Sequence, residues 1–245
     1  MKKIMIIGAA SAIAKESAML FARDGAELYL VDINQGRLEA TQNDILARYQ
    51  TKIKWDVLNV LDFERHEPVF KRAVEALNGL DAVLIAHGTL ANQEETQKSV
   101  EKIIREYNIN CVSVITMASI AANYFEQKKE GMIAVISSVA GDRGRMSNYI
   151  YGAAKGGVTT FLQGLRNRLA HSGVSVLTIK PGMVDTPMTA HLPKSPLFAK
   201  PKDIGKIIYK AMNAKKDVVY APSYWRCIMW VVVHLPEFIF KKLKM

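Results

Sequence analysis

The 245-residue sequence is poor in cysteine: it contains only Cys111 and Cys227, which lie far apart and share no motif. Disulfide frameworks and structural zinc sites need several cysteines at close spacing, so neither is expected here. We therefore predict a protein of a reducing compartment without a metal site. Internal repeats and low-complexity segments are also missing from the sequence, so disorder is not expected.

Long apolar runs are missing as well. The N-terminus has two lysines followed by the apolar stretch Ile4–Ala14, which superficially resembles a signal peptide. That stretch is about one strand long, a glycine turn interrupts it, and no plausible cleavage site follows it. We expect it to form the first core strand and the protein to be cytoplasmic.

Acidic residues are scarce at the C-terminal end. The hydrophobic share of 49% and the charged share of 23% are ordinary for a globular protein, but the formal net charge is +10. Residues 200–245 include ten basic residues and only three acidic ones. A local basic end predicts contact with an anionic surface or substrate. Its lysines alternate with apolar residues and form no nucleic-acid recognition motif, so no nucleic-acid partner is expected.

Short apolar runs alternate with longer amphipathic ones along the whole chain. The short runs predict strands at Lys3–Gly8, Glu27–Asp32, Lys52–Asp56, Ala82–Ala86, Met132–Ser137, Val174–Lys180 and Asp217–Tyr220. The longer ones predict helices at about Ala12–Asp24, Gln35–Tyr49, Phe63–Leu77, Thr96–Gln127, Tyr149–His171 and Asp203–Ala214, with Asp62 capping the third.

Most of these strands are apolar throughout, as strands covered on both faces must be. Strands separated by helices pair in parallel, because each return crosses a face of the sheet. The predicted fold class is therefore α/β: a single-domain, doubly wound (Rossmann), mostly parallel sheet of about seven strands with helices on both faces. We expect residues 1–222 to form a dinucleotide-binding and catalytic domain, followed by an apolar and basic tail at 223–245.

The first strand-to-helix turn is the place to look for a ligand, because ligands bind at the carboxyl ends of parallel strands. It consists of Gly8 and small residues up to Ala14, with Ser11 and Ile13 among them. Small residues let the backbone approach a pyrophosphate, which the amides of the helix N-terminus then hold. A glycine turn also occurs for packing alone, so this signal needs support from elsewhere in the chain.

Asp32 supplies that support at the end of the second predicted strand. A carboxylate there accepts hydrogen bonds from the adenosine ribose hydroxyls and repels a 2′-phosphate, which favours NAD(H) over NADP(H). The alternative is a solvated aspartate at a strand end, which is common. Asp56 and Val57, at the end of the third strand, are expected at the adenine edge.

Tyr151 and Lys155 are four residues apart at the start of a predicted helix, so both lie on one helix face. A tyrosine whose pKa is about 10 is a poor acid or base at neutral pH, and a neighbouring ammonium favours the phenolate and lowers that pKa. Such pairs also arise by chance. Ser138, however, lies just after the predicted strand Met132–Ser137, thirteen residues before Tyr151, where its hydroxyl can orient a substrate oxygen. Asn110 can hold a water near Lys155.

With the turn Pro181–Pro187, these residues make the chain resemble the short-chain dehydrogenase/reductase family over about residues 3–220. The resemblance implies an enzyme, often a homo-oligomer, that passes a hydride between a nicotinamide and an alcohol/ketone pair. It implies that Tyr151 exchanges the proton and that Ser138 polarises the carbonyl. Lys155 would bind the nicotinamide ribose and lower the Tyr151 pKa, and Asn110 would continue the proton relay. The implied cofactor-binding set is Gly8, Ser11, Ile13, Asp32, Asp56, Val57, Ala86, Lys155, Pro181, Val184 and Thr186.

Two departures from the family pattern stand out. The family turn has three glycines, but Ala12 and Ala14 occupy the later two positions, where a methyl would crowd the pyrophosphate and would be strained at positive φ. The family's Asn-Asn-Ala-Gly after the fourth strand is here Ile85 to Gly88, with His87 in it. This histidine is either structural or faces the substrate. The alanine-substituted turn leaves room for an alternative function, a catalytically weak nucleotide-binding scaffold or sensor.

The tail after Pro222 combines tryptophans, phenylalanines and lysines with an apolar run, Cys227–Val233, too short to span a bilayer. Such a segment suits the membrane interface, which would place the protein at the inner face of the membrane. It equally suits a helix that closes the substrate pocket or an oligomer interface. With Arg143 and Arg145 it indicates an anionic, amphiphilic substrate. The sequence also resembles bacterial reductases of decaprenylphosphoryl keto-sugars, which implies a lipid-linked keto-sugar as substrate.

Overall fold

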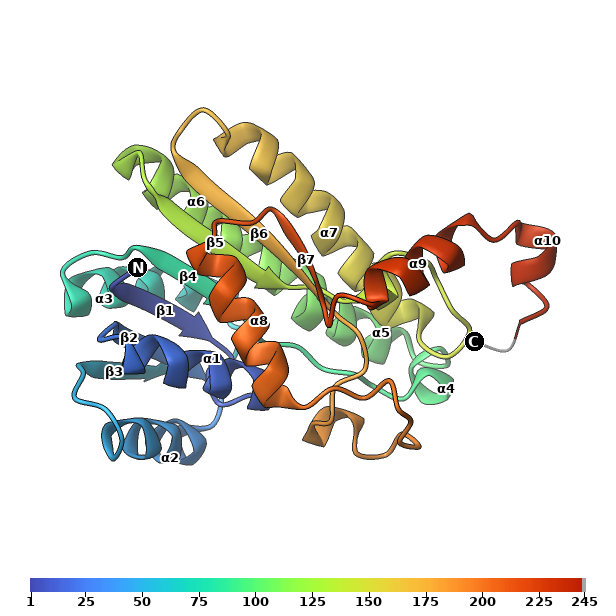
Figure 1. Cartoon of the computed structure of the whole chain (residues 1–245), viewed down its shortest axis with the longest axis horizontal. Coiled ribbons are helices and arrows are strands. Elements are labelled where there is room, and N and C mark those ends of the chain that lie inside the picture. The colour runs from blue at the N-terminus through green and yellow to red at the C-terminus, as the bar shows by residue number, and fades with distance from the viewer. Residues whose placement is uncertain (244–245) are drawn as a thin grey trace.

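A seven-stranded sheet forms the centre of the computed structural model, which describes residues 1–243 (Figure 1). Its strands are β1 (Lys3–Ile7), β2 (Glu27–Asp32), β3 (Ile53–Val57), β4 (Ala82–Ile85), β5 (Gly131–Ile136), β6 (Val174–Pro181) and β7 (Val218–Ala221). They lie in the order β3-β2-β1-β4-β5-β6-β7, and every pair is parallel. The prediction of a doubly wound sheet is confirmed, and the sheet is wholly rather than mostly parallel.

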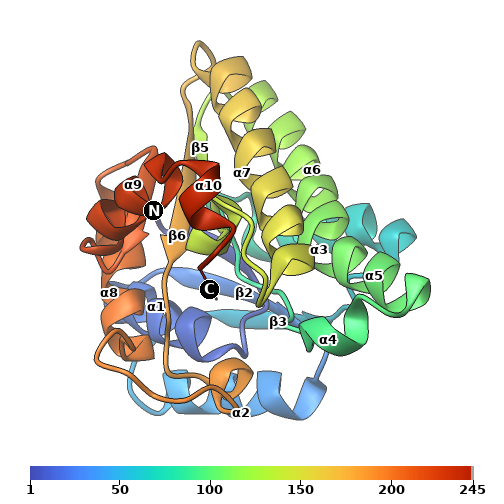
Figure 2. The same ribbon diagram turned by 90° about the vertical axis from the view of Figure 1, so that its right-hand side faces the viewer.

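Helices cover both faces of the sheet (Figure 2). The main ones are α1 (Ala12–Arg23), α2 (Gln35–Leu46), α3 (His66–Leu77), α5 (Val100–Tyr107), α6 (Ser113–Lys128), α7 (Tyr149–Leu169) and α8 (Pro201–Asn213). One core packs α1, α2 and α8 against the sheet, and the other packs α3, α6 and α7. Alternate residues of a strand point to opposite faces, so Met5 belongs to one core and Ile6 to the other.

The segment Thr96–Gln127, which was predicted as one helix, is divided among four helical elements. A short helix, α4 (Gln93–Thr96), precedes α5, and the π-helical turn η2 (Asn108–Val112) joins α5 to α6. The break before α5 arises because the Ser99 side chain accepts the Lys102 amide and caps a new helix. π-helical turns often mark functional sites. Here the turn contains Asn110, one of the predicted site residues.

Asp62 does not act as the predicted cap. The chain first forms a 3₁₀ turn, η1 (Phe63–Arg65), and the Asp62 side chain makes no capping hydrogen bond to it. The α-helix begins only at His66. The sequence indicated the helix correctly but placed its start one turn too early.

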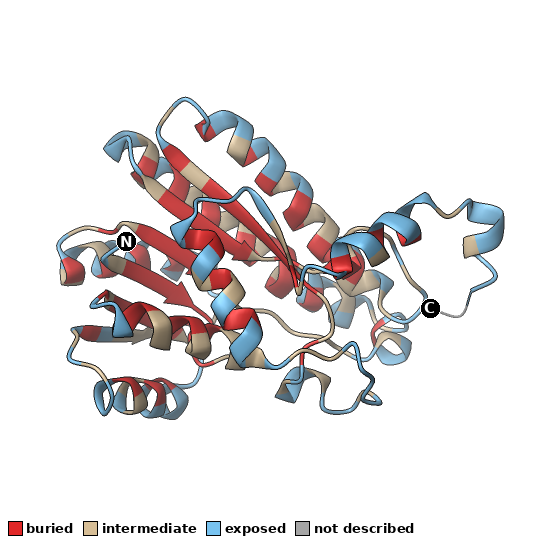
Figure 3. Cartoon of the chain, in the orientation of Figure 1, coloured by how far each residue is buried: buried red, intermediate tan, exposed pale blue. Residues whose placement is uncertain are grey.

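The C-terminal segment forms α9 (Trp225–His234) and α10 (Glu237–Phe240), which project from the body at the right of Figure 1. Trp225, Met229 and Val232 are buried against Val139, whereas most of the remaining surface of the two helices is exposed (Figure 3). Among the described residues, no helix has the length and apolarity needed to cross a bilayer. The first part of the predicted tail is therefore packed on the domain, and its outer face is open.

Candidate active site

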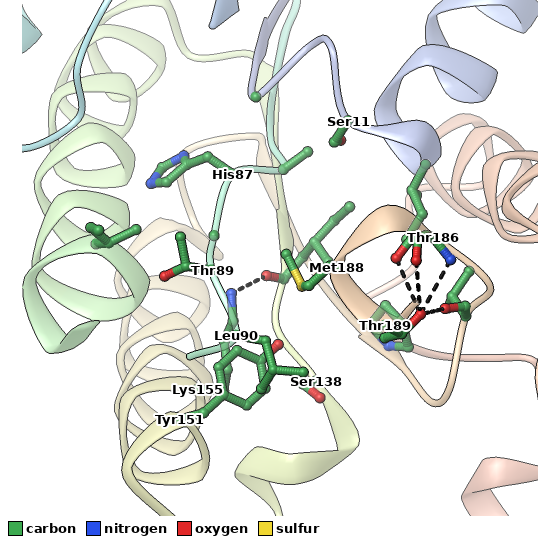
Figure 4. Close-up of a pocket in the computed structure, with 18 of the residues that line it drawn as sticks. Ser11, His87, Thr89, Leu90, Ser138, Tyr151, Lys155, Thr186, Met188 and Thr189 are labelled. Atoms are coloured by element: carbon green, nitrogen blue, oxygen red, sulfur yellow. Dashed lines mark hydrogen bonds between the residues drawn. The ribbon is translucent and has the colours of Figure 1, made fainter. Parts of the chain in front are cut away.

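A cavity of about 480 Å³ opens at the carboxyl ends of the central strands. Eleven of the predicted site residues line it: Gly8, Ser11, Ile13, Asp32, Ala86, Ser138, Tyr151, Lys155, Pro181, Val184 and Thr186. Figure 4 shows Ser138, Tyr151 and Lys155 gathered in one part of it, with Thr186 and Thr189 across from them. Residues far apart in the sequence are thus brought to one site by the parallel sheet.

In the turn after β1, the backbone lies very close to the backbone of the segment that follows β4. Gly8 has a φ of +76°, and a Cβ there would lie 2.6 Å from the backbone nitrogen of His87. Only glycine fits such a place without strain. Ser11 caps α1 by accepting the Ala14 amide, so a helix N-terminus faces the cavity. This turn fits the pyrophosphate of a dinucleotide.

The two alanines of the turn carry none of the backbone strain considered for them. Both lie within α1, and neither is among the residues of positive φ. Ala14 is fully buried in the core and faces away from the cavity, so only Ala12 adds a methyl to the cavity wall. The missing glycines therefore cause no backbone strain, and the Ala12 methyl is what remains of the departure from the family turn.

Asp32 is held in place by the same turn. One carboxylate oxygen accepts the Ala10 amide at 3.0 Å, and the other accepts the Asn34 amide at 3.3 Å. Arg37, which the sequence analysis missed, lines the cavity beside it and donates to the Ala10 carbonyl at 2.6 Å. Its only signal in the sequence is its position in the first turn of a helix that follows Asp32.

Asp56 and Val57 are not among the residues that line the cavity, and their place at the adenine edge stays a prediction. The Asp56 carboxylate instead pairs with Arg72 at 2.5 Å. The chain reaches the cavity directly after Val57, at Leu58, Asn59 and Val60. The reason is that β3 extends to Val57, so its carboxyl end lies beyond Asp56.

Ser138, Tyr151 and Lys155 lie where β5 ends and α7 begins. Ser138 is extended and accepts the Ala140 amide with its Oγ at 3.1 Å, which leaves its proton free to donate. Lys155 is 3% exposed, and its Nζ lies 5.7 Å from the centroid of the Tyr151 ring. Ser137 ties the two elements together, because its hydroxyl bonds the Lys155 carbonyl at 3.1 Å.

Burial raises the pKa of Tyr151 to about 12. A hydrogen bond with Ser138 acts in the opposite direction but has the smaller effect. The rise is opposite to the direction expected from the sequence. The reason is that the ammonium of Lys155 donates to the Ile136 carbonyl at 3.1 Å instead of lying against the phenol oxygen. Burial in turn lowers the pKa of Lys155 to about 8. The phenol is thus arranged to keep its proton, as a general acid must.

We expect the stability of the cofactor-free protein to depend on pH through Lys155. This group titrates near 10.5 when unfolded and at about 8 when folded, so the unfolded chain binds more protons between those values and stability rises with pH there. We therefore compare the unfolding free energy of the wild type with that of Lys155→Met, which cannot titrate at this position. Between pH 7 and pH 10 the difference should shift in favour of the wild type by about 2–3 kcal/mol. Urea denaturation of both proteins at each pH measures this difference; parallel profiles would contradict it.

Asn110 is fully buried and does not line the cavity, yet it lies close to Lys155: a Cβ at Gly88 would be 2.8 Å from its Oδ1 and 3.4 Å from Lys155 Nζ. Its Oδ1 accepts the Thr89 amide at 3.0 Å, and its Nδ2 donates to Glu106. Glu106 is itself buried and accepts the Thr89 hydroxyl at 2.9 Å. The sequence analysis missed this carboxylate. The relay expected of Asn110 stays a prediction.

His87 is held as a neutral ring. Burial, with the charge of Lys155, lowers its pKa to about 3. Ser113 donates its proton to the Ile109 carbonyl at 2.7 Å, so His87 Nε2 must be the donor in its 2.8 Å bond to Ser113. Nδ1 then carries a lone pair, is buried and has no partner among residues 1–243. One nitrogen is structural, and the other is a buried acceptor without a donor in that part of the chain.

No group of three histidines, cysteines or carboxylates within the described residues is placed to hold a metal ion. The cavity instead combines a dinucleotide turn with a serine, a tyrosine and a lysine, all at the carboxyl edge of a parallel sheet. That combination defines a nicotinamide-dependent oxidoreductase of the Rossmann class.

The chain belongs to the short chain dehydrogenase family, whose sequence profile matches residues 2–196. It is similar to an uncharacterised oxidoreductase of Staphylococcus aureus, with 29% identity over 218 residues that cover 89% of this chain and 93% of that protein. It is also similar to an uncharacterised oxidoreductase of Mycobacterium tuberculosis, with 26% identity over 240 residues, 98% of this chain and 96% of that one.

Two solved structures share the fold. Levodione reductase superposes with a TM-score of 0.84 at 21% identity, covering 92% of this chain and 98% of its own. An alcohol dehydrogenase from the archaeon Thermococcus sibiricus, complexed with 5-hydroxy-NADP, superposes with a TM-score of 0.78 at 21% identity. The superposition covers 90% of this chain and 96% of that one. With the family match, these findings make the protein an NAD(P)-dependent oxidoreductase.

Proposed function

We propose that the protein interconverts a ketone and an alcohol with NAD(H) as hydride carrier, and that Tyr151 exchanges the proton. The observation that carries this proposal is that Ser138, Tyr151 and Lys155 line the same cavity as the Gly8 turn. A reacting carbonyl can therefore meet a proton donor and the cofactor together.

The bound nicotinamide supplies the hydride in reduction. The free proton of Ser138 donates a hydrogen bond to the substrate carbonyl oxygen and orients it toward Tyr151. The raised pKa of Tyr151 keeps the phenol protonated until the oxygen becomes basic enough to take the proton. We expect the positive charge of Lys155, whose Nζ lies 5.7 Å from the centroid of the Tyr151 ring, to favour the phenolate that remains without bonding its oxygen.

The proposal is tested by NADH consumption with a panel of simple ketones and keto-sugar phosphates. We expect saturable NADH binding, measured by fluorescence, and turnover of at least one ketone. The absence of saturable binding would contradict hydride transfer. Saturable binding without turnover of any ketone would support the inactive nucleotide-binding scaffold instead.

We further propose that the substrate is a lipid-linked keto-sugar taken up at a membrane surface through α9 and α10. Trp230 and Phe238 are each 65% exposed, and Lys241 and Lys242 are exposed beside them. Aromatic rings flanked by lysines suit the interface of an anionic membrane. Trp225 lines the cavity from the first turn of α9, so this surface adjoins the site.

We expect Trp230→Ser with Phe238→Ser to weaken binding to vesicles containing anionic phospholipid by at least about tenfold, because burying each ring is worth roughly 1.5–3 kcal/mol. Co-sedimentation measures the change. Both side chains are exposed, so the fold should be kept. Val100→Ser removes a comparably exposed apolar side chain from α5 and is the matched control. Equal sedimentation of all three proteins would refute membrane docking by this surface.

A further inference from the structure

The loop after Ser138 carries three charged residues, and the structure separates their roles. Asp142 accepts a 2.5 Å bond from the Lys180 ammonium and a 2.9 Å bond from the Tyr220 hydroxyl. The carboxylate and the ammonium are both nearly buried, so this ion pair fixes the loop to β6 and β7. The Asp142 charge is therefore already balanced by Lys180.

Arg143 binds the C-terminal helices. It donates to the carbonyls of Val232 and Leu235 at 2.7 and 2.6 Å and pairs with Glu237 at 2.8 Å. Its guanidinium also lies 3.7 Å from the centroid of the Phe240 ring. This arginine holds the bend between α9 and α10, and it is not among the described residues that line the cavity.

Arg145 differs from both. It lines the cavity, and no hydrogen bond or ion pair joins its guanidinium to any residue within 1–243. Its Nε is buried without a partner, and burial lowers the pKa of the group. A buried donor without an acceptor costs free energy unless a ligand supplies one. Asn148, which also lines the cavity, has a buried Oδ1 that lacks a donor among the described residues, so a ligand hydroxyl would satisfy it.

The residues that line the cavity carry an excess of positive charge, which also favours an anionic ligand. Arg37, Arg105, Arg145 and Lys155 line it, whereas Asp32 is the one acidic residue among its described lining residues. Asp32 ends β2, and Arg145 follows β5 and precedes α7, the helix of Tyr151, with β1 and β4 between the two strands. Neighbouring strands are about 4.8 Å apart, so roughly 14 Å separates β2 from β5. Arg145 thus belongs to the Tyr151 half of the cavity, away from the Asp32 and Gly8 end.

We propose that Arg145 binds an anionic group of the substrate, a phosphate or carboxylate, so that the enzyme acts on anionic ketones or alcohols. This inference rests on the proposed function and adds the substrate class to it. A guanidinium recognises such groups through paired N–H donors and remains charged at physiological pH. The lipid-linked and the free forms of a keto-sugar phosphate share this chemistry.

The first test compares matched substrates: dihydroxyacetone with its phosphate, methyl acetoacetate with acetoacetate, and a free keto-sugar phosphate with its short prenyl ester. We expect the wild type to prefer the anionic member of at least one of the first two pairs. In Arg145→Ala the ratio of kcat/KM values, anionic over neutral, should fall about 10- to 100-fold, as the loss of a charge-assisted hydrogen bond predicts. Arg145→Lys should lose less, and Lys206→Ala, which removes an exposed charge outside the cavity, should keep the ratio.

The prenyl pair distinguishes a lipid headgroup from a free phosphate, since only a lipid-linked substrate is favoured by the added chain. An unchanged anionic preference in Arg145→Ala, or no preference in the wild type, would overturn the inference while hydride transfer stands.

A second test needs no turnover. With NADH saturating, inorganic phosphate is excluded from the dinucleotide turn and should raise the Tm of the wild type by a few degrees, but not that of Arg145→Ala. If no ketone is turned over, the proposed function fails, and this measurement still decides for or against the anion site. An equal shift in both proteins, or no shift in either, would overturn it.

Discussion

Tyr151→Phe should lower turnover of a ketone by about 10²- to 10⁴-fold, the usual contribution of a positioned general acid. The substitution removes one oxygen and keeps the ring, so the packing of α7 should persist. Affinity for NADH should stay within about twofold of the wild type, because the phenol oxygen is placed to meet the substrate. Steady-state NADH consumption and NADH fluorescence titration measure the two effects separately.

Tyr149→Phe is the matched control for this prediction. Tyr149 lies two residues away on the same helix, is exposed, and bonds Gln97 on the surface at 2.6 Å. It should behave like the wild type in both measurements. Near-normal turnover by Tyr151→Phe would contradict the mechanism proposed here.

Asp32→Asn should shift the cofactor preference strongly toward NADP(H). Two like charges about 4 Å apart cost on the order of 4 kcal/mol near a protein surface, which corresponds to about 10³-fold in affinity. The asparagine keeps an oxygen for the Ala10 amide, so the turn should hold its shape. Arg37, bonded to the Ala10 carbonyl, would then be the dominant charge beside a 2′-phosphate.

The measurement is the ratio of kcat/KM for NADH to that for NADPH, in the wild type and the variant. We expect the wild type to favour NADH and the variant to lose that preference by about 10²- to 10³-fold. Asp203→Asn removes an exposed carboxylate from the first turn of α8 and should leave the ratio unchanged. A wild type that uses NADPH as well as NADH would show that Asp32 does not select the cofactor.

Much of the fold could be predicted because strand burial is a local signal. β2 has the predicted bounds, and the ends of the other six strands differ from prediction by one residue. The predicted helix over Thr96–Gln127 was wrong because its apolar pattern runs on through two interruptions. Ser99 starts a new helix there, and the extra turn at Asn108–Val112 keeps the polar Asn110 buried. Neither feature changes the hydrophobic periodicity from which helices are predicted.

The site residues that follow a motif could be placed, and those that depend on tertiary contacts could not. Glu106 is an ordinary helical glutamate in the sequence, and only its contacts with Thr89 and Asn110 make it part of the site. The ion pair of Asp56 with Arg72, which comes from α3, is likewise a tertiary contact that the sequence does not show. The direction of the Tyr151 pKa depends on burial and on where the Lys155 ammonium points, which a spacing of four residues does not determine.

The shape of the turn at Gly8 bears on how related enzymes are found. A left-handed backbone is required at this one position, where His87 leaves no room for a side chain, while the next two positions of the motif are ordinary helix. Searches that demand three glycines would therefore discard chains whose turn keeps the left-handed glycine and the helix N-terminus that face the cavity. A filter that keeps the first glycine and admits alanine at the other two would recover them, and this protein is an example of what such a filter would retain.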